Sequence, residues 1–240
     1  MTFTDALQVA DSMDRAITLA LNFDGGAFQN SMWWAFSSRW VWVPMGVIFL
    51  YVLLREKPEW RHPVLVILGL VLTILLCDRI SSGLIKPMVE RMRPCRDEVI
   101  GPLIHIVNGY KSGNYGFVSS HAANAFGAMV YVSLVLRRKL ITVPFIVFAV
   151  LVSYSRVYLG VHYFGDVVCG AALGAVLGYA CFRFIQWAYR NAYIHRPAEA
   201  QISSFGGVSS LQNCWLMSLA LSVTILVCLV IGGVAWTQSL

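Results

Sequence analysis

Three short polar clusters lie at the ends of hydrophobic segments in this sequence, and their residue types suit the binding and cleavage of a phosphate ester. The clusters are Lys86-x6-Arg93-Pro94, Ser119-Ser120-His121 and Ser155-Arg156-x5-His162-x3-Asp166. Together they supply three cations, two histidines and a carboxylate. Ionisable side chains are costly to place beside a bilayer core, so where they occur they indicate a functional site.

The third cluster has the pattern of a nucleophile with an orienting group. A histidine that attacks phosphorus must be neutral at one ring nitrogen, and a carboxylate can hold the other by accepting its N–H. Asp166 follows His162 by four residues, so both can share a helical face or a turn. Arg156 can stabilise charge on a transferring phosphoryl group. The alternative is an interfacial Asp–His pair beside an unrelated arginine.

The first cluster can grip a phosphate with two cations. Lys86 and Arg93 are seven residues apart, so they share a helix face if the helix continues through Pro87. Pro94 would then end that helix. Arginine offers a bidentate fork and lysine a point charge. The alternative is a pair whose side chains extend toward lipid headgroups.

The second cluster begins an apolar segment. Ser119 is a good N-cap, and the free N–H groups of a helix start favour an anion there. His121 falls in the first turn, and Ser120 can either offer its hydroxyl to a phosphate or cap the helix. The alternative is a simple cap beside an interfacial histidine. Residues of the long loop before this cluster, such as Arg91, either read a headgroup or are simply solvated.

The segments that carry these clusters indicate an integral membrane protein. Of the 240 residues, 58% are hydrophobic and 12% are charged, whereas soluble domains have about 25% charged residues. A bilayer span needs roughly 20 mostly apolar residues. Six segments qualify, of which the first is the weakest because Arg39 interrupts it. They are 32–54, 62–85, 119–136, 140–157, 165–188 and 213–236.

The predicted fold is all-α: a polytopic helical bundle of about six transmembrane helices that forms a single membrane domain over residues 1–240. Residues 4–22 alternate polar and apolar side chains at helical spacing, which predicts an N-terminal amphipathic helix on the membrane surface or against the bundle. Residues 190–212 are predicted to be a flexible cytoplasmic connection before the last span. Gly170, Gly174 and Gly178 predict a close helix contact.

Six spans place the loops 86–118 and 158–164 on the same side of the membrane, so all three clusters can form one site. The opposite side carries nine basic residues, against six on the site side once the cluster cations are set aside. The positive-inside rule then places the site outside the cytoplasm. We attribute the net charge of +6 to these basic loops rather than to a surface that binds nucleic acid. The cysteines show no metal or disulfide spacing.

In order and spacing the clusters resemble the three signature motifs of the type-two phosphatidic acid phosphatase superfamily, over residues 62–188. The resemblance implies a membrane lipid phosphatase without metal or cofactor and with 62–188 as its catalytic core. His162 would form a phosphohistidine, Asp166 would orient it, and His121 would protonate the leaving oxygen. The residues implied to bind the phosphate are Lys86, Arg93, Ser119 and Arg156.

The middle motif departs from the family pattern. That pattern is Pro-Ser-Gly-His, whereas this chain has Val118-Ser119-Ser120-His121. The serine and histidine of the motif remain, but the absence of proline and glycine can change the backbone of the loop.

The sequence therefore predicts hydrolysis of a lipid phosphate or diphosphate at the periplasmic face of a bacterial inner membrane. Candidate substrates are undecaprenyl diphosphate, lipid A phosphate, phosphatidylglycerol phosphate and phosphatidic acid. One alternative is a phosphotransferase that uses a lipid phosphate donor. Another is a protein that binds or flips such lipids without hydrolysis; that reading is disfavoured because the charges gather at one interface rather than in mid-span.

Overall fold

The computed structural model describes residues 2–56, 61–192 and 211–238, and their secondary structure is helical apart from one isolated β-bridge between Met92 and Tyr115. The long helices are α1 (Phe3–Leu21), α2 (Gly26–Ser37), α3 (Val43–Glu56), α4 (Arg61–Asp78), α6 (Ser120–Leu136), α7 (Lys139–Tyr158), α8 (Phe164–Ala192) and α10 (Leu211–Gln238). The short elements are η1 (Arg39–Trp42), η2 (Arg79–Ile85), α5 (Lys86–Val89), η3 (Pro94–Arg96), η4 (Gly101–Leu103) and η5 (Val107–Gly109).

The predicted all-α membrane bundle is confirmed. Four helical segments are long and apolar enough to cross a membrane: Pro63–Val89, Lys139–Tyr158, Phe164–Asn191 and Trp215–Ala235. A fifth consists of α2 and the segment after it, and the shorter apolar helix α6 occupies the expected span at 119–136. The last expected span, 213–236, lies within α10, whereas most of the expected connection at 190–212 falls outside the described residues.

The first expected span, 32–54, is not one straight helix. Its helical structure begins at Gly26, and the axis bends by 61° between α2 and the segment that contains η1 and α3. Ser38 at the bend is extended, with φ −72° and ψ 141°, and its hydroxyl accepts from the backbone N–H of Trp40 at 3.3 Å. A serine side chain that takes a backbone donor competes with the helix, and here it does so beside the charge of Arg39.

Helix α6 lies at the centre of the bundle and packs most extensively against α8. Gly170, Gly174 and Gly178 of α8 face it, and a Cβ on Gly174 would overlap the carbonyl oxygen of Ala123. The predicted glycine contact is therefore confirmed. Glycine is required there because only a bare Cα lets the two backbones approach so closely.

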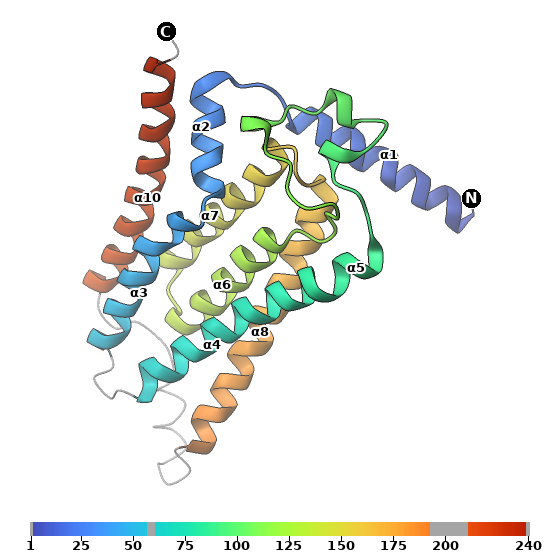
Figure 1. The fold of residues 1–240 in the computed structure, drawn as a ribbon. Coiled ribbons are helices and arrows are strands. Elements are labelled where there is room, and N and C mark those ends of the chain that lie inside the picture. The colour runs from blue at the N-terminus through green and yellow to red at the C-terminus, as the bar shows by residue number, and fades with distance from the viewer. Residues whose placement is uncertain (1, 57–60, 193–210, 239–240) are drawn as a thin grey trace.

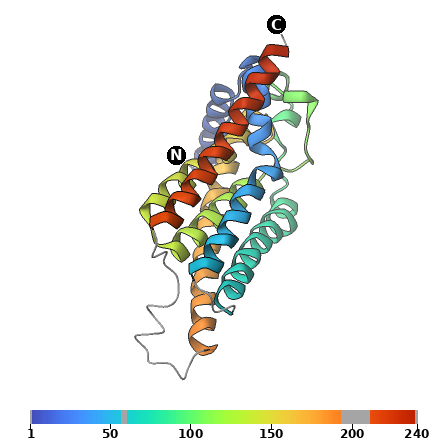
Figure 2. The same ribbon diagram turned by 90° about the vertical axis from the view of Figure 1, so that its left-hand side faces the viewer.

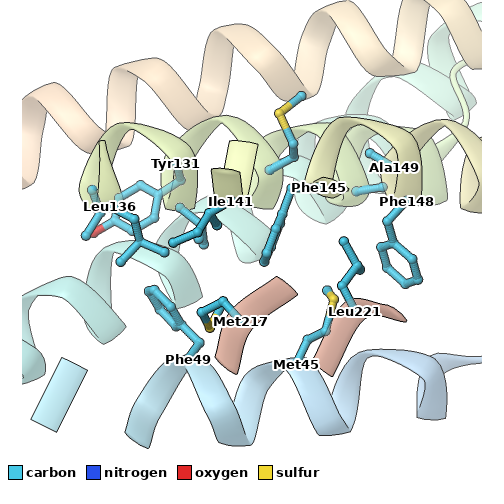
Figure 3. Close-up of a cluster of buried hydrophobic side chains, with 14 of the residues drawn as sticks. Met45, Phe49, Tyr131, Leu136, Ile141, Phe145, Phe148, Ala149, Met217 and Leu221 are labelled. Carbon is cyan, nitrogen blue, oxygen red and sulfur yellow. The ribbon is translucent and has the colours of Figure 1, made fainter. Parts of the chain in front are cut away.

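A second buried layer joins α10 to α2, α3 and α7, and α6 also contributes side chains to it. Figure 3 shows its side chains meeting between the helices: Met45, Phe49, Tyr131, Leu136, Ile141, Phe145, Phe148, Ala149, Met217 and Leu221. Among the labelled side chains, Tyr131 carries a hydroxyl, which donates to the carbonyl of Val66 at 2.9 Å and is therefore paired.

One end of the bundle gathers the irregular structure. The loop between α5 and α6 and the turn between α7 and α8 lie there, and α1 extends outward beside them (Figure 1). The view turned by 90° shows the long helices running alongside one another (Figure 2). Helix α1 buries Thr18 and leaves Leu7 and Met13 more than half exposed, as expected for an amphipathic helix, and Asn22 at its C-cap is buried too.

Candidate active site

All three polar clusters meet at the looped end of the bundle, and each comes from the end of a different helix. The first begins in α5, at the end of the continuous segment α4–η2–α5, and runs into the loop after it. The second begins α6, and the third joins the end of α7 to the start of α8. The segment η2 is a π-helix that directly precedes Lys86. Such departures from α-helical geometry occur frequently at functional sites.

Lys86 and Arg93 do not share a helix face, contrary to the sequence expectation. The helix does continue through Pro87, but α5 ends at Val89, and Glu90 adopts a left-handed conformation with φ 50°. Arg93 is extended, with ψ 155°, as steric contact with a following proline requires. The backbone N–H of Arg93 then donates to the carbonyl of Asn114 at 3.2 Å, which fastens this strand-like stretch to the loop before α6.

The nucleophile candidate and its partners form a contiguous buried set. Nδ1 of His162 lies 3.4 Å from Oδ2 of Asp166, and Nη1 of Arg93 lies 3.0 Å from Nε2 of His162. A guanidinium has only donors, so Nε2 must be the acceptor, and Nδ1 must carry the hydrogen that faces Asp166. Nε2 thus carries the lone pair that an attack on phosphorus requires, and in this structure that lone pair accepts from Arg93.

The electrostatic surroundings keep His162 neutral. Burial, together with the positive charges of Arg93, Arg156 and Lys86, lowers the pKa of His162 well below its ordinary value of 6.5. The side chain is 2% exposed, so burial is the larger cause. A neutral imidazole at pH 7 is the form that can act as a nucleophile.

Ser119 and Ser120 play different parts at the start of α6. Ser119 is the N-cap, because its hydroxyl accepts from the N–H of Ala122 at 3.4 Å, and its own N–H donates to the carbonyl of Asp166 at 2.9 Å. The Ser120 hydroxyl instead accepts from Nζ of Lys86 at 2.7 Å. Ser82 of η2 lies 2.8 Å from the Ser120 hydroxyl and was not identified from the sequence, although its spacing of four residues before Lys86 was a usable signal.

Arg156 and His121 line one open cavity. Its volume is about 620 Å³, and its walls include Trp34, Tyr110 and Asn124. The Arg156 guanidinium is buried and contacts the Ser37 hydroxyl through Nη1, while its Nε–H has no partner within the described part of the chain. An unpaired buried donor beside a cavity is suited to an anionic ligand.

Arg91 is the candidate residue whose surroundings differ most from those predicted from the sequence. Its Nη1 lies 3.0 Å from Oδ1 of Asp166 and 2.8 Å from Oδ2 of Asp14 on α1. It is therefore neither a solvated loop residue nor directed toward a headgroup. Burial opposes the charge of Arg91, but Asp166, Asp14 and Asp11 outweigh burial and raise the pKa of Arg91.

Across the residues that the structure describes, no three His, Cys, Asp or Glu side chains are grouped so that they could hold a metal ion. The hydrogen-bond donors and positive charges of the site are instead suited to binding an anion. The described cluster combines three cations, a neutral histidine backed by a carboxylate, and a second histidine on an open cavity. Such a set can bind a phosphate and attack it.

Comparisons with known proteins agree with this chemistry. The family model described as the PAP2 superfamily matches residues 62–190, which include all three clusters. The lipid A 4'-phosphatase of Bacteroides thetaiotaomicron is 34% identical over 180 residues, covering 75% of this chain and 79% of that protein. The lipid A 4'-phosphatase of Porphyromonas gingivalis is 29% identical over 217 residues, covering 90% of this chain and 91% of that protein.

One solved structure also resembles this fold. It is the crystal structure of a transmembrane PAP2-type phosphatidylglycerolphosphate phosphatase from Bacillus subtilis. The TM-score is 0.57 and the sequence identity is 25%, and the match covers 76% of this chain and 89% of that one.

Proposed function

The chain belongs to the PAP2 superfamily, and we propose that it hydrolyses a phosphate group from a membrane lipid through a phosphohistidine formed at His162. One observation carries the proposal: Arg93 meets Nε2 of His162 while Asp166 faces Nδ1. The nucleophile's lone pair therefore faces a cation that can bind the phosphate, so a phosphate held by Arg93 would lie beside Nε2.

The reaction then has two steps. The Nε2 lone pair of His162 attacks phosphorus, the bond from phosphorus to the lipid oxygen breaks, and His121 donates a proton to that oxygen. Water next attacks the phosphohistidine, His121 takes up a proton from that water, and the P–N bond breaks to release inorganic phosphate and neutral His162. Throughout, Asp166 accepts the Nδ1–H and stabilises the positive charge that forms on the ring.

The cations stabilise the phosphoryl group that is being transferred. Arg93 and Arg156 both have an Nε–H without a partner in the described residues, so they can offer donors to the phosphate without breaking existing bonds at these atoms. Lys86 is held by Ser120 and supplies a third positive charge. Donors that are already in place where charge develops supply a large part of the catalysis in such sites.

A lipid A phosphate is the substrate that we propose first, because two relatives that cover most of this chain are lipid A 4'-phosphatases. Phosphatidylglycerol phosphate is the next candidate, supported by the relative of known structure. Undecaprenyl diphosphate completes the set predicted from the sequence.

We further propose that the site faces the periplasm from a bacterial inner membrane. Basic residues gather at the end of the bundle opposite the site. They are Arg55 at the end of α3, Arg137 after α6, Lys139 at the start of α7, and Arg183 and Arg190 toward the end of α8. Basic residues in short connections favour the cytoplasmic side.

Phosphate release by purified protein from these three lipids and phosphatidic acid, with EDTA present, tests the activity. We expect release from at least one lipid, its loss in His162→Ala, and its retention in His105→Ala. His105 is a matched control because it lies at the same end of the bundle but contacts Asn30 at 3.2 Å. Folded wild-type protein that releases no phosphate from any lipid would indicate binding or flipping instead. Release that survives in His162→Ala would refute the nucleophile assignment.

A further inference from the structure

Arg91 connects the proposed catalytic carboxylate to the N-terminal helix α1. Its Nη1 contacts Asp166 and Asp14 at 3.0 and 2.8 Å, and its Nη2 contacts Asp11 at 3.0 Å. The guanidinium also stacks over the ring of Tyr163, at 3.9 Å from the ring centroid. One side chain thus bridges a fully buried carboxylate of α8 and two carboxylates of α1.

Helix α1 also supplies the partners for the start of α8. The first backbone N–H groups of a helix have no partner within that helix. Here the N–H of Phe164 donates to the hydroxyl of Thr18 at 3.0 Å, and the N–H of Gly165 donates to Oδ1 of Asp14 at 2.7 Å. Gly165 permits this approach, because a Cβ there would lie 2.7 Å from the Asp14 carboxylate.

The two oxygens of Asp166 have separate tasks. Oδ2 faces Nδ1 of His162 and accepts from the N–H of Tyr163 at 3.1 Å, whereas Oδ1 faces Arg91. A buried carboxylate is costly unless it is paired and hydrogen-bonded. The contact with Arg91 therefore fixes both the charge and the rotation of the carboxylate that holds His162.

We propose that Arg91 and Asp14 are positioning residues, through which α1 holds Asp166, and so His162, in the orientation for attack. The proposal rests on the proposed hydrolysis at His162. Neither residue needs to touch the phosphate. Their effect passes through the Asp166 carboxylate to the Nδ1–H of His162.

The kinetic test compares Arg91→Gln, Arg91→Lys and Arg15→Gln. Arg15 is the matched control, because it ties α1 to the rest of the protein through Asp97 at 3.2 Å without contacting Asp166. We expect kcat of Arg91→Gln to fall about 10- to 100-fold, as when a partner of a functional side chain is removed, with KM nearly unchanged. Arg91→Lys should recover part of the loss, since lysine keeps the charge but not the fork. Arg15→Gln should stay close to wild type.

Asp14→Asn examines the α1 side of the bridge. The amide oxygen can still accept from Gly165, but it no longer carries the charge that holds Arg91. We expect a smaller loss of kcat than in Arg91→Gln, and the double variant should lose little more than Arg91→Gln alone, because the two residues act in one network.

A spectroscopic measurement decides the proposal even if no lipid is hydrolysed. In protein labelled with ¹⁵N-histidine, and with signals assigned through His162→Ala, the wild type should show His162 as the Nδ1–H tautomer. Arg93 fixes this tautomer in every variant, so the readout is the position of the Nδ1–H signal. That signal should shift in Arg91→Gln, because Asp166 is no longer held facing Nδ1, and it should stay in place in Arg15→Gln. An Nδ1–H signal at the same position in Arg91→Gln and wild type would overturn the proposal. A raised KM with normal kcat would overturn it too, because Arg91 would then bind the substrate.

Discussion

At the scale of single residues, the contact between Arg93 and His162 has a consequence for substrate binding. Nη1 of Arg93 lies 3.0 Å from Nε2, in the space that the phosphorus atom would enter in the proposed attack. Nη1 also donates to the carbonyl of Val161 at 2.8 Å. The phosphate must therefore replace the imidazole as an acceptor of Arg93. Arg93 is already buried, with only 5% of its surface exposed, so exchanging the imidazole for the phosphate requires no further desolvation of the guanidinium.

The depressed pKa of His162 predicts how activity responds to acid. The neutral ring is the proposed nucleophile, so activity should persist as pH falls below 6.5 and decline only near the lowered pKa. Lys86 contributes to the depression. In Lys86→Gln the pKa of His162 therefore rises toward 6.5, and the acid limb of kcat/KM should move to higher pH.

Profiles of kcat/KM between about pH 4 and pH 8 measure this limb. Lys111→Gln is a suitable control, because Lys111 is an exposed loop lysine. Titration of the substrate phosphate is common to all variants and cancels in the comparison. An acid limb at the same pH in Lys86→Gln and wild type would show that Lys86 does not set the protonation of His162.

At the scale of helices, the contact between α6 and α8 carries both stability and site geometry. The N-cap of α6 donates to Asp166 in α8, so the two helices position the second and third clusters relative to each other. Gly174→Ala would force the Cβ against the carbonyl of Ala123. We expect it to destabilise the protein by about 1–3 kcal/mol, as overpacked sites do, and to lower activity with it.

Thermal unfolding in detergent measures this effect, with Gly233→Ala as the matched helix glycine. A Cβ at Gly233 meets no atom within 4 Å, and alanine is the better helix former, so its Tm should hold or rise slightly. Equal Tm values for the two variants would contradict the close α6–α8 contact.

The same scale shows what the sequence could predict. Hydropathy located the spans, because a bilayer demands long apolar helices, and glycine spacing located the α6–α8 contact. The end of α5 at Val89 was not predictable, since the left-handed Glu90 has no glycine or asparagine to signal it. The bridge from Arg91 to Asp14 joins residues 77 positions apart, and no local pattern encodes such a contact.

At the scale of the whole molecule, the number of crossings decides whether the clusters can form one site. The loop after α5, the turn after α7 and the end of α10 all lie at the same end of the bundle (Figure 1). Counting the spans in the sequence was enough to predict that these segments lie at one end. It could not predict the 61° bend between α2 and the helix after it. The bend results from local competition for backbone hydrogen bonds, and a hydropathy profile contains no information about such competition.

The orientation of the bundle gives the last prediction. Because α10 ends on the side of the site and the turn between α6 and α7 lies at the opposite end, reporters at these two places should behave oppositely. In a bacterial host, alkaline phosphatase fused to the C-terminal end should be active, and green fluorescent protein there should stay dark. Fusions to a chain that ends after Lys139 should show the reverse, because alkaline phosphatase folds outside the cytoplasm. The opposite pattern would place the site in the cytoplasm: the proposed chemistry would stand, and the periplasmic assignment would fall.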